Sequence, residues 1–157
     1  MSSYEIYIAY MTIVRKEIQR FMRIWVQTLL PPSITMVLYF IIFGNLIGSR
    51  IGQMGGFDYM QFIVPGLIMM SVITNSYGNV VSSFYSTKYQ GSLEEMLVSP
   101  TPNWVILAGY VTGGVARGLA VGAIVTSLSM FFTQLEIYNF GIIVLVVLMT
   151  SILFSLG

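Results

Sequence analysis

The segment IWVQTLLPPSITMVLYFIIFGNLIGS, residues 24–49, contains no charged side chain. It is longer than the stretch of about 20 mostly apolar residues that a helix needs to cross the hydrocarbon core of a membrane. Three further intervals follow the same pattern and contain Arg117 as their only charge: 59–87, 96–135 and 137–157. The sequence therefore predicts an all-α polytopic membrane protein with about four transmembrane helices, near residues 26–48, 60–85, 105–132 and 140–157.

The composition of the chain agrees with this class. Of its 157 residues, 56% are hydrophobic and 8% are charged, whereas soluble domains carry about 25% charged residues. The alternative, an unusually apolar soluble domain, would have too little polar surface to cover itself. The net charge of +1 offers no strong field to nucleic acid. Because the chain has no Cys or His, we predict no disulfide and no metal site, and we see no nucleophile–base pair that would make it an enzyme.

The placement of lysine and arginine predicts the orientation in the membrane. Only Arg50 lies between the first and second spans, whereas five basic residues lie on the other side: Arg15, Lys16, Arg20, Arg23 and Lys88. Cytoplasmic segments carry the excess of such residues. The N-terminus and the loop 86–104 are therefore predicted to be cytoplasmic.

Residues 4–25 are predicted to form an amphipathic helix at the interface between membrane and cytosol. One face of the helical wheel is apolar: Met11, Val14, Ile18, Phe21, Met22 and Trp25. The opposite face is basic and polar: Arg15, Lys16, Gln19, Arg20 and Arg23. A helix of this kind lies on a membrane surface. We expect the chain to turn into the membrane near Pro31 and Pro32, which interrupt helical hydrogen bonding. The alternative is one long first helix with a basic flank.

The second predicted span carries a polar stripe in an otherwise apolar segment. Its members follow one another at steps of three or four residues: Ser71, Asn75, Asn79, Ser82 and Ser86. Polar side chains in hydrocarbon need partners, so this face is expected to look into a bundle or a wet cavity. The stripe indicates either a substrate pathway, with Ser71, Asn75 and Asn79 as candidates, or hydrogen bonding between helices.

The third predicted span combines small residues with one charge. Glycines four residues apart predict close packing of helices, and the span has two such sets: Gly109 with Gly113, and Gly114 with Gly118 and Gly122. Arg117 lies deep in the span, where a charge faces the protein interior, a cavity or a lipid headgroup. Its expected partner is another subunit, a backbone carbonyl group or an anionic substrate. No Asp, Glu or His falls within a predicted span, which disfavours a proton-coupled secondary transporter.

Between the second and third spans, residues 92–99 (SLEEMLVS) predict a short cytoplasmic helix. Ser92 and Glu95 match a capping box, with Ser92 as the N-cap. Glu94 and Glu95 lie at the positive end of the helix dipole. Two prolines follow and end the helix.

This helix has about two turns, which is too short to be stable alone in water. It therefore needs a surface on which to pack. Its apolar face consists of Leu93, Met96 and Leu97. Either the helix lies against its own bundle, or it docks on a soluble partner. The chain has no GxxxxGK[ST] loop, so any ATP would have to be bound by another polypeptide.

Four stretches, in this order, resemble the ABC-2 family of transporter permeases, and within it the inner-membrane transport permeases of bacteria: RFMRIWVQTLLPPSITMVLYFIIFG, GLIMMSVITN, YQGSLEEMLVSPTP and GYVTGGVARG. The resemblance implies an interface helix at residues 4–25, with Arg15, Lys16, Arg20 and Arg23. It also implies a coupling helix that docks in a cleft of a separate ATPase subunit through Ser92, Leu93, Glu94, Glu95, Met96 and Leu97. ATP and Mg²⁺ would bind to that subunit, and two permeases would assemble with two ATPases to export a substrate.

Family members usually have six spans, whereas this chain ends within the fourth predicted one. The resemblance therefore implies that residues 1–157 are an incomplete ABC-2 transmembrane domain. The alternative to an exporter permease is a non-transporting membrane assembly protein, held together through the small-residue faces of Gly114, Gly118 and Gly122.

Overall fold

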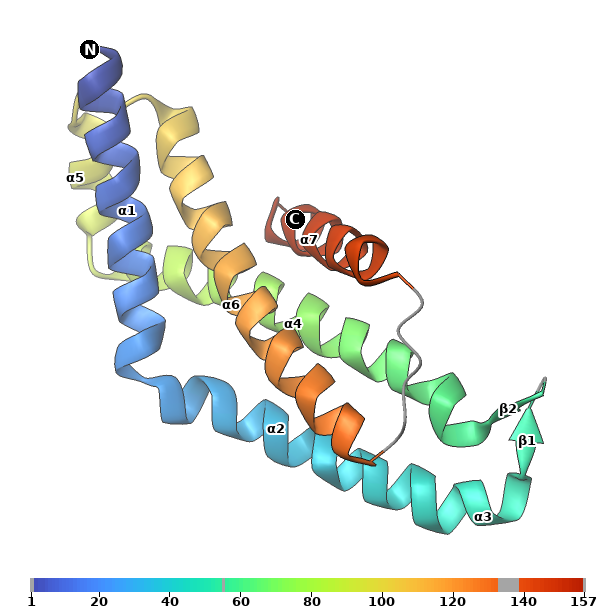
Figure 1. Ribbon diagram of the computed structural model, residues 1–157. Helices are drawn as coiled ribbons and strands as arrows, with labels where there is room; N and C mark the ends of the chain where they lie inside the picture. The colour runs from blue at the N-terminus through green and yellow to red at the C-terminus, as the bar shows by residue number, and fades with distance from the viewer. Residues whose placement is uncertain (1, 55, 133–138, 157) are drawn as a thin grey trace.

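The computed structural model describes residues 2–54, 56–132 and 139–156, and these residues are almost entirely helical (Figure 1). The elements are α1 Ser3–Arg23, α2 Trp25–Ile41, the π-helix η1 Ile42–Ile47, α3 Gly48–Ile51, β1 Gln53–Met54, β2 Phe57–Asp58, α4 Tyr59–Tyr89, α5 Ser92–Val98, α6 Asn103–Phe132 and α7 Phe140–Leu156. The prediction of an all-α class is confirmed, with one addition. The two short strands pair antiparallel and join the helical arm α2–α3 to α4.

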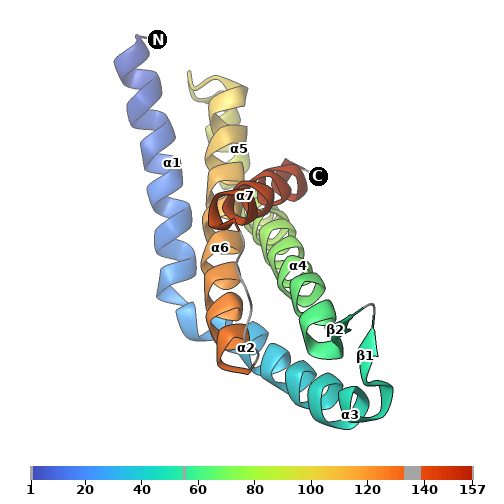
Figure 2. The same cartoon turned by 45° about the vertical axis from the view of Figure 1, so that its right-hand side comes forward.

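Helix α6 is the centre of the arrangement, because it contacts α1, α2, α4 and α7. Helices α2–α3 and α4 run in opposite directions as two long arms (Figure 1). Helix α1 lies along the first half of α6, and α7 packs against both α4 and α6 (Figure 2). The short α5 lies at the same end of the molecule as the N-terminus.

The chain turns sharply between α1 and α2, but the turn is not at the prolines. Ile24 has φ −110° and ψ 34°, which interrupts the helix there. Pro31 and Pro32 lie inside α2, which continues through them. Near the prolines, side-chain hydroxyl groups donate hydrogen bonds to backbone carbonyl groups of the same helix; for example, Ser33 Oγ donates to Leu29 O at 2.7 Å. The prediction of a turn near Pro31 and Pro32 is therefore wrong, because the break occurs earlier, where the uncharged run begins.

Two helical segments are long and apolar enough to cross a membrane, Trp25–Ile51 and Asn103–Phe131. Helix α7 is also apolar but shorter, with 17 residues. Helix α4 covers the predicted span 60–85, yet it is not among the helices that pass this test in the described part of the chain. The polar stripe explains the difference, because its serine and asparagine side chains lower the mean hydropathy of α4.

The apolar core is small, whereas large apolar side chains cover the outside. The core cluster consists of Met36, Phe40, Val64, Val121 and Val125. Most side chains on α7 are exposed, including Phe140 at 69% and Leu153 at 65%. Soluble proteins rarely expose continuous apolar surface of this extent. The distribution suits a protein whose surroundings are lipid.

Glycines make the crossing of α4, α6 and α7 close. A Cβ on Gly114 would lie 2.5 Å from Val80 Cγ2 and 2.6 Å from Ser155 Oγ. A Cβ on Gly122 would lie 2.8 Å from Val72 Cγ2. The three glycines of the GxxxGxxxG run, Gly114, Gly118 and Gly122, thus all face neighbouring helices where added atoms would collide with them.

Candidate functional site

Helix α1 has three faces that follow one another around its axis. The buried face centres on Val14, Glu17 and Phe21 and packs on α6. Next comes an exposed apolar band, which contains Tyr4, Tyr7, Met11, Ile18 and Met22. The remaining arc is polar and includes exposed Arg15, Lys16 and Arg23. The expected apolar face is thus only partly buried: Val14 and Phe21 lie inside, whereas Met11, Ile18, Met22 and Trp25 lie outside.

Glu17 was not singled out in the sequence, yet its carboxylate is 1% exposed. Ser83 Oγ donates to Glu17 Oε1 at 2.7 Å, and Arg20 Nη2 lies 3.6 Å from Glu17 Oε2. Gly113 provides the space, since a Cβ there would lie 2.7 Å from the Cβ of Glu17. The sequence contains a signal for this burial: Glu17 follows Val14 by three residues and precedes Phe21 by four.

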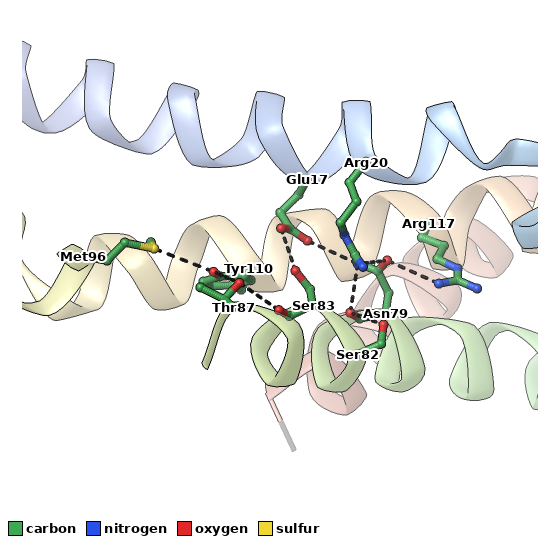
Figure 3. A network of polar contacts seen from close by, with 9 residues as sticks. All are labelled: Glu17, Arg20, Asn79, Ser82, Ser83, Thr87, Met96, Tyr110 and Arg117. Carbon is green, nitrogen blue, oxygen red and sulfur yellow. Dashed lines mark hydrogen bonds and ion pairs between the residues drawn. The ribbon is translucent and has the colours of Figure 1, made fainter. Parts of the chain in front are cut away.

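Three helices bring two arginines to one amide oxygen (Figure 3). Arg20 Nη2 on α1 donates to Asn79 Oδ1 on α4 at 3.0 Å, and Arg117 Nη1 on α6 donates to the same oxygen at 3.4 Å. Arg20 Nη2 also donates to the backbone carbonyl oxygen of Asn79 at 3.3 Å. We call Glu17, Arg20, Asn79 and Arg117 the arginine cluster. Arg117 thus bonds to a side-chain amide, which was not among the partners predicted for it, and the described residues supply no carboxylate partner.

The polar face of α4 departs in part from the predicted stripe. Ser71, Asn75 and Asn79 are buried as the spacing indicates, but Ser82 and Ser86 are exposed. Their neighbours Ser83 and Thr87 are buried instead, together with Ser76. The reason is that the buried face continues from Asn79 in steps of four, toward Glu17 on α1 and Tyr110 on α6. Asn75 Nδ2 donates within its own helix, to Ser71 O at 2.9 Å.

A chain of contacts leads from this face to the short helix α5 (Figure 3). Tyr110 Oη on α6 donates to Thr87 Oγ1 at 3.0 Å and lies 3.8 Å from Met96 Sδ on α5. Thr87 Oγ1 in turn donates to Ser83 O at 2.9 Å. The same face of α4 therefore contacts the arginine cluster at one end and, through Tyr110, α5 at the other.

The start of α5 is not the predicted capping box. Gly91 is the N-cap residue, with φ 76° in the left-handed region, and no side chain caps the helix. Glu94 N bonds to Gly91 O at 3.2 Å, so Ser92 is the first helical residue and Glu94 is the third. The capping-box prediction is wrong because the conformation that glycine permits places the turn one residue earlier. Glu94 and Glu95 still lie in the first turn of the helix.

Helix α5 divides into a packed arc and an exposed arc. Its half-buried residues are Ser92, Leu93 and Met96, with Ser99 at the C-cap. Its exposed residues are Glu94, Glu95, Leu97 and Val98. The predicted apolar face is therefore split, since Leu93 and Met96 face the bundle whereas Leu97 is 56% exposed. One side of α5 thus packs on the bundle, and the opposite side is exposed.

A cleft of about 210 Å³ separates the ends of α1, α5 and α6. It is lined by Ala9, Thr12, Ile13, Met96, Ser99, Thr101 and Ile106. In the described ranges, no three acidic, histidine or cysteine residues gather closely enough to hold a metal ion. The charged groups that the helices gather are those of the arginine cluster, with two guanidinium groups and one carboxylate.

Comparison with known proteins agrees with the resemblance drawn from the sequence. The model of the family of ABC-2 type transporters matches residues 8–157. The chain is 63% identical over 151 residues to a protein named inner membrane transport permease YadH from Escherichia coli strain K12, and equally to the protein of that name from Shigella flexneri. The match covers 96% of this chain but 59% of each relative. No solved structure matches the chain. The chain therefore belongs to the ABC-2 type transporter family.

Proposed function

We propose that this chain is part of the permease subunit of an ATP-binding cassette exporter, and that a separate ATPase subunit binds ATP and Mg²⁺. The observation that carries the proposal is the division of α5 into two arcs. The packed arc keeps a helix of 7 residues folded on its bundle. The exposed arc presents two carboxylates and two apolar side chains, which is the chemistry of a docking surface. Membership in the ABC-2 family supports an ATPase as the partner.

The contacts of α5 support a coupling role. On its packed arc, Met96 lies against Tyr110, and Tyr110 is bonded to Thr87. A displacement of α5 by a docked partner would therefore act on α4 and α6 together. The family resemblance adds the source of that displacement, which is the closure of two ATPase subunits on ATP.

We propose that the N-terminus and α5 are cytoplasmic and that α1 is an interface helix. The bias of basic residues supports this orientation. The three faces of α1 support the position, since a helix at an interface needs a protein face, a lipid face and a polar face. The sharp corner at Ile24 allows α1 and α2 to run in different directions (Figure 1). By analogy with the relatives, whose name places them in the inner membrane, the membrane is the bacterial inner membrane. The family resemblance further implies that two permease copies pair.

A role of Ser71, Asn75, Asn79 and Arg117 in the substrate pathway is part of this proposal. Its support is that all four are polar groups inside an otherwise apolar bundle, where such groups mark functional sites. Asn79 and Arg117 carry the stronger case, because they meet across α4 and α6. Asn75 is the weaker candidate, because its side-chain bond stays within α4.

The test is co-purification of the whole permease with the ATPase encoded beside it. Replacing Glu94 and Glu95 by Gln removes both charges, and we expect at least about a tenfold loss of bound ATPase, since one charge-assisted bond is equivalent to about tenfold in affinity. The matched control is Glu5→Gln. Glu5 is an exposed carboxylate whose capping box a glutamine preserves.

Two results would contradict the proposal. In one, no ATPase co-purifies with the unaltered protein. In the other, the double Glu→Gln variant keeps its partner whereas bulky residues at Gly114 and Gly118 disrupt every complex, as expected of a membrane assembly protein.

A further inference from the structure

The arginine cluster holds more positive charge than negative charge. Arg20 and Arg117 donate to the same oxygen of Asn79, so their guanidinium groups are close neighbours. Glu17 pairs with Arg20. In the described part of the chain, Arg117 has no carboxylate partner at all. The two neighbouring guanidinium groups carry like charges and repel each other, and surroundings of low polarity strengthen the repulsion.

The cluster also holds more hydrogen-bond donors than acceptors. Each arginine uses one terminal nitrogen, although a guanidinium group has five N–H donors. In the cluster, one buried acceptor has no hydrogen-bond donor among the described residues, Glu17 Oε2, whereas three buried donors have no acceptor: Arg20 Nε, Arg117 Nε and Asn79 Nδ2. The Asn79 side chain is 0% exposed, so its unpaired amide group is out of reach of bulk solvent. A buried donor without an acceptor costs about 1–3 kcal/mol.

An anion with several acceptor oxygens would offset both the excess of positive charge and the excess of hydrogen-bond donors. Guanidinium groups bind phosphate oxygens in pairs, in a geometry that a carboxamide cannot provide. An anion can reach the cluster from outside the protein, because the side chain of Arg20 is 31% exposed. The site lies deep in the helical bundle: Arg117 is about 21 Å along α6 from its first residue, Asn103.

We propose that the arginine cluster binds a phosphate group, with Arg20 and Arg117 as the ligands and Asn79 as the group that holds them together. The phosphate would belong to the headgroup of an anionic lipid or to a soluble phosphate compound. Binding at this site needs no ATPase subunit, so the test below is independent of the proposed transport function.

The test measures binding of phosphatidic acid to the protein in micelles of an uncharged detergent, by native mass spectrometry. Phosphatidylcholine is the zwitterionic comparison. We expect the unaltered protein to bind phosphatidic acid saturably and in preference to phosphatidylcholine. Arg117→Gln is expected to weaken this binding at least about tenfold, the effect of one lost charge-assisted bond. Arg15→Gln removes an exposed charge from α1 and is expected to change it less than about twofold.

A second variant separates binding from folding. Asn79→Asp places a carboxylate of nearly the same shape between the two arginines, where it neutralises the excess charge. This variant is expected to unfold at the same temperature as the unaltered protein or at a higher one, yet to lose phosphatidic acid binding about tenfold. A merely structural role of the cluster would leave lipid binding unchanged.

Competition identifies the source of the phosphate. If inorganic phosphate or pyrophosphate displaces phosphatidic acid, the cluster recognises the phosphate group alone. If neither displaces it, the cluster recognises the group on a lipid. The proposal is overturned if the unaltered protein does not distinguish phosphatidic acid from phosphatidylcholine, or if Arg117→Gln and Arg15→Gln bind it equally.

Discussion

The buried carboxylate of Glu17 provides the sharpest test of how α1 is attached. The substitution Glu17→Gln keeps the size of the side chain and removes its charge. In the native protein, Ser83 donates to one carboxylate oxygen at 2.7 Å, and Arg20 lies 3.6 Å from the other. Ser83 and Arg20 face different oxygens of the carboxylate, and a glutamine replaces one of these oxygens by an NH2 group, so it keeps one of the two contacts in this geometry.

The magnitude follows from these two contacts. A hydrogen bond to a charged group contributes about 1.5–3 kcal/mol. Removing one partner of a fully buried ion pair costs about 3–5 kcal/mol, but this figure must be reduced because the Arg20 side chain is 31% exposed and partly solvated. We therefore expect Glu17→Gln to lower the free energy of unfolding by about 2–3 kcal/mol.

The assay is unfolding in mixed micelles, in which a denaturing detergent is added and loss of helical circular dichroism is measured. Glu5→Gln is the matched control, and as a surface change with its cap preserved it is expected to cost less than about 0.5 kcal/mol. The double variant Glu17→Gln/Arg20→Gln should cost less than the sum of the single variants by at least about 1 kcal/mol, because the two residues share one contact.

The reasoning is refuted if Glu17→Gln unfolds like Glu5→Gln, or if the effects of the two single variants add. The first result would mean that the contacts of Glu17 do not stabilise the fold, and the second that Glu17 does not interact with Arg20.

Two further predictions concern packing and hydrogen bonding in α4 and α6. Gly118→Ala should destabilise the protein by about 1–3 kcal/mol, because its Cβ would collide with α4. The control Gly78→Ala meets no atom within 4 Å and should be neutral or stabilising. Equal effects of the two variants would contradict the close crossing of α4 and α6. Tyr110→Phe removes the hydroxyl bonded to Thr87 and should cost about 1 kcal/mol in the same unfolding assay. The control Tyr85→Phe changes a side chain that is 67% exposed and should cost nothing measurable.

The all-α class was predictable from the sequence because long intervals contain almost no charge. Proline was a weaker guide, since Pro100 and Pro102 follow α5 whereas Pro31 and Pro32 lie inside α2. Residues 92–99 illustrate both the success and its limit. These residues form a short amphipathic helix, as predicted, but its N-cap is Gly91. The left-handed backbone conformation of Gly91 does not follow from the pattern of polar and apolar side chains. Which side of α5 packs depends on Tyr110, whose contact with Met96 arises only when the fold brings α5 and α6 together.

The candidate site was harder to predict than the helices, because it depends on contacts between α1, α4 and α6. Asn79 and Arg117 could be singled out as polar residues in apolar spans. Glu17 was harder to single out, because its spacing places it on the face of Val14 and Phe21 whereas its charge favours the solvent side. Its burial requires a glycine on another helix, at Gly113, and a hydroxyl on a third, at Ser83.

Lipid provides no hydrophobic driving force between helices, so close packing and polar contacts must hold them together. In this chain, close packing and polar contacts contribute differently at each face of α6. Toward α4 and α7, the glycines at 114, 118 and 122 bring the helices together through close packing. Toward α1, Gly113 creates the space and Glu17 fills it with a charge, which binds Ser83 on α4 as well. One carboxylate thus connects three helices. The same carboxylate pairs with Arg20, whereas Arg117 has no ionic partner in the described residues, so the contact that attaches α1 neutralises one of the two arginines of the cluster.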